Sequence, residues 1–347
     1  MTAASDTLTG LWYLACPSRA LVKSAMVRRI FFNDPIVLGR TKDGAPFALR
    51  DVCPHRGAPL SKGRICDHDK AAVECPYHGW RFRTSDGGCA GVPSLSENDA
   101  FDPRPISVQK YDLHEANGVI WIFHGERANA PPPALGLSED FRPKTVTTVT
   151  AHGPFDEAVI GLIDPAHTPF VHRQWWWREG RASEEKTKHF EPTPLGFRMP
   201  PHRPSSNSRI YGFLGGAPTT EIEFRLPGVR LETIRNDKHT ILGLTAMTPT
   251  EKNATQIIHI IFWDMALLSA IRPVAARMAD SFLAQDEAIL NAQNKNLSRI
   301  DHRPLYAGDP DTPAQWYYAL KKAWVETGST FESFQNPLTA KTLHWRT

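Results

Sequence analysis

The spacing of hydrophobic and polar residues divides the chain into two regions. The first, from Ala20 to about Phe123, consists of short apolar runs separated by tight turns, which is typical of short strands. Its clearest hairpin patterns are residues 36–40 and 46–49 around Asp43-Gly44, and residues 80–83 before Asp86-Gly87-Gly88. This region is therefore expected to be a small all-β domain.

The second region mixes two periodicities. Alternation of apolar and polar residues predicts strands at residues 145–150, 220–226, 228–234, 241–247 and 256–263. Two further stretches are predicted to be helices, from Phe155 to about His167 and from Pro273 to about Asn294. We therefore expect a mainly antiparallel sheet with helices packed on it, and an α+β class for the whole chain.

A proline run separates the two regions. Residues 130–134 are Ala-Pro-Pro-Pro-Ala, which form a stiff, extended linker. A chain of 347 residues is long for one domain and sufficient for two that each bury a core. We predict an N-terminal domain at residues 1–127 and a C-terminal domain at residues 128–347.

Composition narrows the possible partners. The net charge of +3 is mild, and no long run of Lys and Arg is present, which argues against nucleic acid. Residues 1–9 lack a basic start and an apolar segment, so no signal peptide is expected. The most apolar stretch, residues 257–262, is far shorter than the ~20 residues that span a bilayer. We expect a cytoplasmic protein without a membrane partner.

The five cysteines are an odd number, which in a cytoplasmic chain favours metal binding over disulfides. Two short segments, Cys53-Pro54-His55 and Cys75-Pro76-Tyr77-His78, each contain one thiol and one imidazole. Two Cys and two His are the ligands of a Rieske [2Fe–2S] cluster. A glycine follows each segment and permits the tight turns that a buried cluster requires.

A structural zinc site is the alternative for these four residues. Zinc sites usually pair Cys with Cys and His with His, whereas each loop here mixes the two, so the cluster is favoured. Cys66-Asp67-His68 has similar spacing, but no glycine follows it and it lies too close to Cys75 for a separate loop. Cys66, Cys16 and Cys89 are expected to be ordinary core or surface residues.

A second candidate metal site lies at residues 164–172, Asp-Pro-Ala-His-Thr-Pro-Phe-Val-His. Two His and one carboxylate on one face of an iron leave positions open for O₂ and substrate. On a continuous helix His167 and His172 would point about 140° apart. We therefore predict that the helix ends between them at Pro169, because proline disfavours helix at the residue before it. A single His here would be interpreted as structural, but the pair favours a metal.

The third ligand is expected to be Asp286 on the late helix. Residues three and four positions away on either side are Phe282, Leu283, Ile289 and Leu290, so its carboxylate would lie within an apolar stripe, with Glu287 toward the edge. Coordination to a metal is one of the few ways to compensate a buried carboxylate. A buried ion pair is the alternative role.

Residues 53–60, Cys-Pro-His-Arg-Gly-Ala-Pro-Leu, and residues 75–80, Cys-Pro-Tyr-His-Gly-Trp, closely resemble the cluster loops of Rieske non-haem iron oxygenases. The resemblance implies an all-β Rieske domain followed by a helix-grip-like catalytic domain. It also implies that Trp80 covers the cluster, and that a mononuclear Fe(II) is held by His167, His172 and Asp286.

The resemblance further implies a role for Asp164, which precedes His167 by three residues. In this family such an Asp connects the cluster His of a neighbouring subunit, here His78, to the iron ligand His167, so that electrons pass between subunits of a trimer. An N-cap ahead of Pro165 is the alternative role, and both can hold together.

The expected activity is that of a terminal oxygenase. Electrons would come from a ferredoxin or a reductase, with NAD(P)H acting only indirectly, and O₂ would be activated to hydroxylate or demethylate an aromatic or other apolar small molecule. Within the family, the chain is most similar to the group of vanillate and dicamba O-demethylases and toluenesulfonate methyl-monooxygenase. A ring cis-dihydroxylating dioxygenase and a Rieske electron-transfer protein are the alternatives. Basic residues near the cluster would suit an acidic ferredoxin, although a solvated surface fits equally: Arg56, Lys62, Arg64, Arg81 and Arg83.

Two further features concern the expected iron site. Many relatives have an Asn three or four residues before the bridging Asp, where this chain has Gly161 and Ile160, so no polar group is expected there. Trp175, Trp176 and Trp177 follow the His pair and would form the roof of the pocket, a core cluster or a subunit interface.

Overall fold

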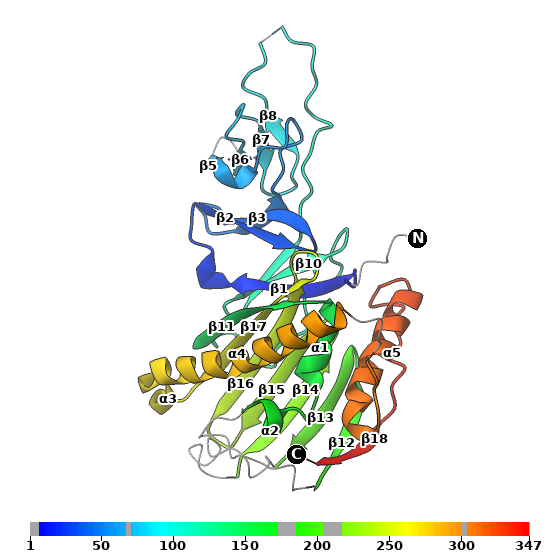
Figure 1. Cartoon of the computed structure of the whole chain (residues 1–347). Helices are drawn as coiled ribbons and strands as arrows, with labels where there is room; N and C mark the ends of the chain where they lie inside the picture. The colour runs from blue at the N-terminus through cyan, green and yellow to red at the C-terminus, as the bar shows by residue number, and fades with distance from the viewer. Residues whose placement is uncertain are drawn as a thin grey trace. The chain divides into compact units, whose positions relative to one another are not determined.

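The computed structural model describes residues 7–66, 71–96, 98–172, 185–203, 217–299 and 304–346. The chain forms two compact units (Figure 1). The N-terminal unit comprises Leu14–Pro133 and Thr250–Lys252, and the C-terminal unit comprises Met1–Tyr13, Ala134–Pro249 and Asn253–Thr347. The division into folding domains at residues 127/128 stays a prediction.

Local contacts explain why each unit includes a segment distant in sequence. In the N-terminal unit the amide of Asn33 donates to the carbonyl of Thr250, 2.7 Å away. In the C-terminal unit the indole of Trp324 donates to the carbonyl of Thr9, at 2.8 Å. The short turn therefore belongs to the N-terminal unit and the start of the chain to the C-terminal unit, because the backbone of each is hydrogen-bonded there.

The N-terminal unit is built from short antiparallel strands in three small sheets. Their orders are β2-β3-β4, β5-β6-β7-β8 and β1-β10-β9. The strands are β1 Leu11–Pro17, β2 Ala25–Phe31, β3 Asp34–Arg40, β4 Pro46–Arg50, β5 Arg64–Cys66, β6 Ala72–Glu74, β7 Arg81–Arg83, β8 Cys89–Gly91, β9 Leu113–Ala116 and β10 Val119–His124, with short 3₁₀ turns η1 Ser18–Ala20 and η2 Leu60–Lys62. The predicted hairpins are confirmed as the β3–β4 and β7–β8 pairs.

The core of this unit includes both cysteines of the predicted cluster. Cys53 and Cys75 lie in one apolar cluster with residues from β3, β4, β6 and β7, among them Leu49, Val73 and Phe82. Cys16 and Cys89 are buried and Cys66 is partly exposed. Two apolar sheets therefore surround the bases of the two cluster loops.

The C-terminal unit is one large antiparallel sheet with helices. The strand order is β11-β17-β16-β15-β14-β13-β12-β18. The strands are β11 Thr145–His152, β12 Glu185–Thr193, β13 Gly196–His202, β14 Thr219–Arg225, β15 Val229–Arg235, β16 Thr240–Pro249, β17 Ala254–Trp263 and β18 Lys341–Arg346. The helices are α1 Phe155–Ile163, α2 Thr168–Val171, α3 Ala266–Ala270, α4 Arg272–Leu297 and α5 Thr312–Glu326, with a 3₁₀ turn η4 Asp309–Asp311. The α+β prediction and the five predicted strands are confirmed.

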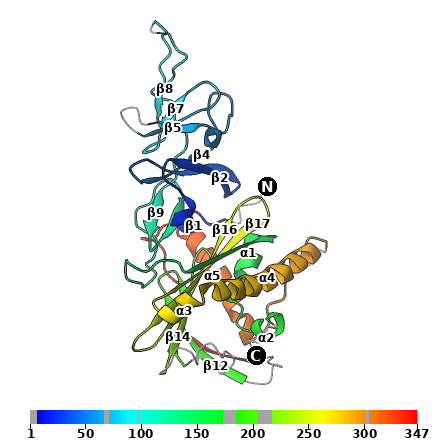
Figure 2. The ribbon, with the colours of Figure 1, turned by 90° about the vertical axis from the view of Figure 1, so that its left-hand side faces the viewer.

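Helices α1, α4 and α5 lie on one face of this sheet (Figures 1 and 2). On α4 the carboxylate of Asp280 accepts a 2.6 Å hydrogen bond from the Thr147 hydroxyl of β11. On α5 the ring of Tyr317 contacts Phe224 of β14. Strand pairing places Thr147 and Phe224 in one row across five strands, which confirms that both helices cover the same face. We call this the helix-covered face.

The first predicted helix is shorter than expected. Helix α1 ends at Ile163 rather than near His167, and Asp164 has an extended backbone with ψ of 120°. Proline at position 165 explains this end, since it disfavours helical backbone at the residue before it. The second predicted helix is confirmed as α4. In the described part of the chain, no helix is both long and apolar enough to cross a membrane.

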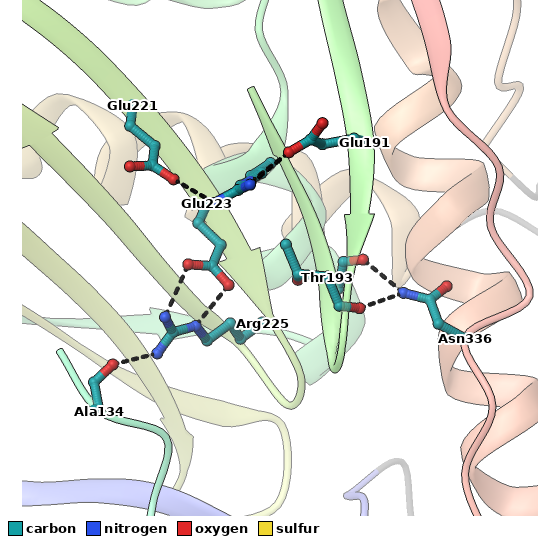
Figure 3. A network of polar contacts seen from close by, with 9 residues as sticks. Ala134, Glu191, Thr193, Glu221, Glu223, Arg225 and Asn336 are labelled. Atoms are coloured by element: carbon teal, nitrogen blue, oxygen red, sulfur yellow. Dashed lines mark hydrogen bonds and ion pairs between the residues drawn. The ribbon is translucent and has the colours of Figure 1, made fainter. Parts of the chain in front are cut away.

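The hairpin of β12 and β13 is fixed from outside the sheet by Asn336 (Figure 3). Its amide nitrogen donates to the carbonyls of Thr193, at 2.6 Å, and Gly196, at 2.7 Å. Charged pairs connect this hairpin to β14, because Arg198 of β13 binds both Glu191 of β12 and Glu221 of β14. The amide contacts close the turn of a hairpin with few apolar residues.

Replacement of Asn336 by Asp should destabilise the C-terminal unit. The variant loses two donors and places a negative charge beside two carbonyl oxygens, which should cost about 2 kcal/mol. The midpoint of urea unfolding, followed by tryptophan fluorescence, measures the effect. Replacement of the exposed neighbour Gln335 by Ala is the control, and equal midpoints for both variants would contradict the assigned role.

Candidate metal centres

The two loops predicted to hold the cluster have the same backbone design. Cys53 follows β4 and Cys75 follows β6, and each carbonyl accepts a hydrogen bond from the glycine four residues on, Gly57 at 2.8 Å and Gly79 at 3.1 Å. Both glycines have positive φ, +73° and +72°, a backbone conformation that other residues rarely adopt. The sequence pattern Cys-Pro-X-X-Gly thus produces the same closed turn twice.

Each turn is closed a second time by the cysteine amide. Cys53 N donates to the carbonyl of Ala58, at 2.9 Å, and Cys75 N to that of Trp80, at 2.8 Å. The histidine is the second residue after the cysteine in one loop and the third in the other. The ring centroids of His55 and His78 are nevertheless only 4.7 Å apart. The paired turns therefore bring two imidazoles together.

The four side chains fit a cluster of the predicted kind. Both thiols are buried, and burial raises the pKa of Cys53 to about 11, with the neighbouring Cys75 thiol adding to this. Within the described residues, the buried Nδ1 of His78 has no hydrogen-bond partner. A buried, unpaired nitrogen beside two buried thiols is costly. Coordination of iron by these atoms would remove that cost.

Trp80 lies where the resemblance expects a cover. Its ring stacks on His55 with centroids 4.8 Å apart and planes 10° from parallel. Tyr77 lies against His78, with a centroid distance of 3.8 Å, and is exposed. Of the two imidazole ligands expected here, one is therefore shielded by an indole and the other by a phenol.

The structure brings His167, His172 and Asp286 together. One possible ligand atom from each residue lies within 4.8 Å of the others. The Nε2 atoms of the two imidazoles are 3.6 Å and 3.3 Å from the same carboxylate oxygen, Oδ1 of Asp286. The Nε2 of His172 is buried and, within the described residues, has no hydrogen-bond partner. This donor set fits a metal cation, which both imidazoles and the carboxylate would share.

The other nitrogen of each imidazole is held by an acceptor. His167 Nδ1 is 2.8 Å from the backbone carbonyl of Asp164, and His172 Nδ1 is 3.3 Å from Oε1 of Gln285. These contacts leave both Nε2 atoms free to bind a metal. Burial lowers the pKa of His167, which favours the neutral imidazole that metal binding requires.

The route by which the two imidazoles converge differs from the prediction. Pro169 does not end a helix but lies in the first turn of the short helix α2, with His167 just before it and His172 just after it. The break comes earlier, between α1 and Pro165. The 140° argument is confirmed in that no continuous helix carries both residues, but the position it gave to the break is wrong. The two ring centroids are 5.4 Å apart.

The apolar stripe around Asp286 is only partly as predicted. Leu283 and Leu290 are buried, but Ile289 is 50% exposed and lies outside the stripe. Phe282 stacks on His172 with centroids 3.5 Å apart. Asp286 therefore lies at the edge of the buried stripe, with its side chain 21% exposed.

The carboxylate of Asp164 has a local partner. Its Oδ1 accepts a 2.7 Å hydrogen bond from the amide of Ala166, and its Oδ2 is 3.9 Å from His167 Nδ1. The N-cap role foreseen as an alternative is not observed, because α2 has His167 as its N-cap and Asp164 instead closes a turn between α1 and α2. The side chain of Asp164 is 34% exposed.

Gly161 lies at one of the positions where many relatives have Asn, and here it allows two helices to pack closely. A Cβ atom on Gly161 would lie 2.7 Å from Cδ2 of Leu290, so α1 and α4 approach closely at this point. Asp67, His68 and the residues Trp175, Trp176 and Trp177 lie outside the described residues.

Sequence reasoning missed Gln285 and Phe282 as partners of His172. Both lie on α4 within one turn of Asp286, at positions i−1 and i−4. Their helical proximity to the predicted ligand was the available indication. Which imidazole they would contact depends on the packing of α2 on α4.

Comparison with known proteins defines the class. Residues 11–112 match the family described as Rieske [2Fe-2S] domain, and residues 161–316 match the vanillate O-demethylase oxygenase C-terminal domain. A Rieske domain holds a [2Fe–2S] cluster, and oxygenases of this kind use a mononuclear iron. Taken together, the two matched domains show that the chain belongs to the Rieske-type oxygenases.

Individual relatives support the same family. Dicamba O-demethylase from Stenotrophomonas maltophilia is 35% identical over 169 residues, 47% of either chain. Chlorophyllide a oxygenase of Chlamydomonas reinhardtii is 26% identical over 314 residues, 85% of this chain and 45% of that protein. The chain thus spans about half the length of these curated relatives. A crystal structure of dicamba monooxygenase bound to dicamba has the same fold, with a TM-score of 0.74 and 20% identity over 91% of this chain and 97% of that one.

Replacement of Gln285 by Leu should weaken metal binding at the second site. Without its acceptor, His172 can turn or change tautomer, which typically costs 10- to 100-fold in metal affinity. Anaerobic titration of the metal-depleted site with Co(II), followed by absorbance, measures this affinity. Gln285→Glu keeps the oxygen acceptor and should bind as the wild type does. Equal affinity of the Leu variant would contradict the assigned contact.

Proposed function

We propose that this chain is the terminal oxygenase of a multicomponent system. Cys53 and Cys75 would bind one iron of the cluster, and His55 and His78 the other. His167, His172 and Asp286 would bind the mononuclear Fe(II). When bound, these groups supply electrons and activate O₂. The main support is the convergence of two imidazoles on one carboxylate, because an electron-transfer Rieske protein has no need of that second site.

The same residues suggest how the site would be organised. Gln285 and the Asp164 carbonyl would orient the two imidazoles, and Phe282 would fix the plane of the His172 ring. Two His and one carboxylate leave coordination positions for O₂ and substrate. The relatives include dicamba O-demethylase. We therefore propose hydroxylation or oxidative demethylation of an aromatic or other apolar small molecule.

We further propose a ferredoxin or reductase as electron donor and a trimeric assembly in a cytoplasmic setting. The basic face near the cluster is weaker than the sequence suggests. Arg64 and Arg81 both pair with Glu74, and Arg83 pairs with Asp86, so much of the positive charge is compensated. Recognition of a donor would therefore depend less on long-range attraction than on contacts near the exposed Tyr77.

Replacement of Asp286 by Ala should remove the mononuclear iron and keep the cluster. Iron content should fall from about three to about two atoms per chain, with an unchanged Rieske EPR signal and no product. Anaerobic iron analysis with EPR measures both. Glu287→Ala, the adjacent carboxylate on α4, is the control and should keep all three irons. Full iron content in the Asp286 variant would exclude Asp286 as a ligand.

Replacement of Asp164 by Asn should leave both metals bound and abolish electron transfer between them. The backbone carbonyl that holds His167 is unchanged, and the Asn oxygen can still accept from Ala166. The rate of cluster reoxidation by O₂ and substrate, measured by stopped-flow absorbance, should fall by up to about a hundredfold. Asp237→Asn, an exposed carboxylate, is the control. An unchanged rate would remove Asp164 from the path.

A further inference from the structure

Polar side chains gather on the helix-covered face of the large sheet. His259 of β17, Thr245 of β16 and Arg230 of β15 are directly paired across the three strands. His259 also pairs with Thr147 of β11, which binds α4, so the row faces that helix. Glu232 lies two residues beyond Arg230 on the same face. These groups have no part in the metal sites described above.

On β16 and β17 this face retains accessible surface where neighbouring residues of the opposite face are buried. On β17 the partly exposed His259 and Ile261 alternate with the buried Ile258, Ile260 and Phe262. On β16 Gly243 is partly exposed between two buried leucines. The accessible positions on neighbouring strands point to the same side. They therefore lie together on the helix-covered face.

Gly243 leaves a gap on this face by lacking a side chain. A Cβ atom built there would lie 3.5 Å from Cε1 of His259 and 3.9 Å from Cβ of Glu232. These are ordinary contact distances, so a methyl group would fit and would occupy the gap between the two side chains. The glycine thus leaves a space beside an imidazole edge.

The imidazole is neutral and faces helix α4. Its surroundings lower the pKa of His259 to about 4, chiefly through burial and then through the Arg230 charge, while Glu232 and Asp286 act in the opposite sense. His259 pairs with Thr147, which binds Asp280, six residues before Asp286 on α4, so the imidazole faces the helix that carries the proposed iron ligand. Nδ1 is 2.8 Å from the Thr245 hydroxyl.

The charged groups of the cluster compensate each other. Arg230 and Glu232 form an ion pair of 3.0 Å, and both side chains are about one-quarter exposed. A substrate carboxylate would have to break this pair to bind Arg230, leaving Glu232 uncompensated and repelling the ligand. A neutral group would meet no such cost.

We propose that His259, oriented by Thr245, and the gap at Gly243 bind a neutral hydrogen-bonding group of the substrate, with the Arg230–Glu232 pair excluding carboxylates. The substrate class is then a small, apolar aromatic compound that carries an amide, carbonyl or hydroxyl group. This inference rests on the proposed oxygenase function and specifies its substrate. Because Nδ1 is bonded to the buried Thr245 hydroxyl, the imidazole offers Nε2 to such a group, as donor or acceptor according to its tautomer.

Matched pairs of small aromatic probes test this proposal. Benzamide and benzoate, and phenylacetamide and phenylacetate, differ in charge but scarcely in shape. Binding to the iron-loaded protein is measured by anaerobic equilibrium dialysis, which needs no turnover. Each amide should bind roughly tenfold more tightly than its carboxylate, the size of about one hydrogen bond to a neutral group.

Two variants locate the binding group. His259→Leu should weaken amide binding roughly tenfold, and Gly243→Ala should weaken it severalfold by filling the gap. The control is His189→Leu, because His189 also pairs with a threonine, Thr342, across strands of this sheet but is exposed. Iron content and circular dichroism should stay unchanged in all three. The Gly243 variant keeps the test valid if His259→Leu does not fold.

The outcomes separate this inference from the proposed function. Tighter binding of the carboxylates, unchanged amide binding in both variants, or no binding by any probe up to its solubility would overturn the neutral site. Such a result with three irons per chain and O₂-dependent product would leave the oxygenase proposal intact. Loss of the second iron site would instead refute the proposed function, whatever the probes do.

Discussion

The approach of helix α4 to the segment after α1 is the contact on which the C-terminal unit depends. It places the Asp286 carboxylate against two imidazoles that come from a different part of the chain. The helix is fixed independently, since Thr147 donates to Asp280 and the amide of His152 donates to Asn291. These anchors lie on either side of Asp286 along α4. The carboxylate is thereby positioned by the sheet rather than by the imidazoles.

This arrangement keeps polar atoms in costly surroundings. His172 has a buried Nε2 without a partner in the described part of the chain, and the same holds for Nδ1 of His78. Each such atom would cost roughly 1–3 kcal/mol if it stayed unsatisfied. Two different units thus each have an unsatisfied imidazole nitrogen beside further metal-binding groups. Metal binding offsets these costs, so it should stabilise both units as well as supply their chemistry.

Much of the fold followed from periodicity, and the omissions have physical reasons. Strands β14 to β17 alternate clearly, whereas β12 is largely polar and buries little besides Phe190, so no pattern identified it. Helix α5 was not predicted, although its sequence has the apolar residues Ala314, Tyr317, Leu320 and Trp324 at helical spacing. The end of α1 at Ile163 also followed from Pro165, although the prediction gave that role to Pro169.

The two metal sites differ in how much of each could be predicted from the sequence alone. The cluster loops are local, because each cysteine, histidine and glycine acts within six residues, and the spacing alone contains the turn. The contacts of Asp286 join segments more than a hundred residues apart, so the stripe on α4 predicted the residue but not its partners.

The polar row on the sheet was beyond sequence reasoning for a stricter reason. His259, Thr245 and Arg230 lie on three strands, and only the register of each pair brings them side by side. A shift of one residue in either pairing would turn a member of the row to the opposite face. If the proposed substrate site is correct, substrate recognition depends on strand register, whereas binding of the cluster depends on local motifs. Relatives that share the motifs can differ in substrate without changing any metal ligand.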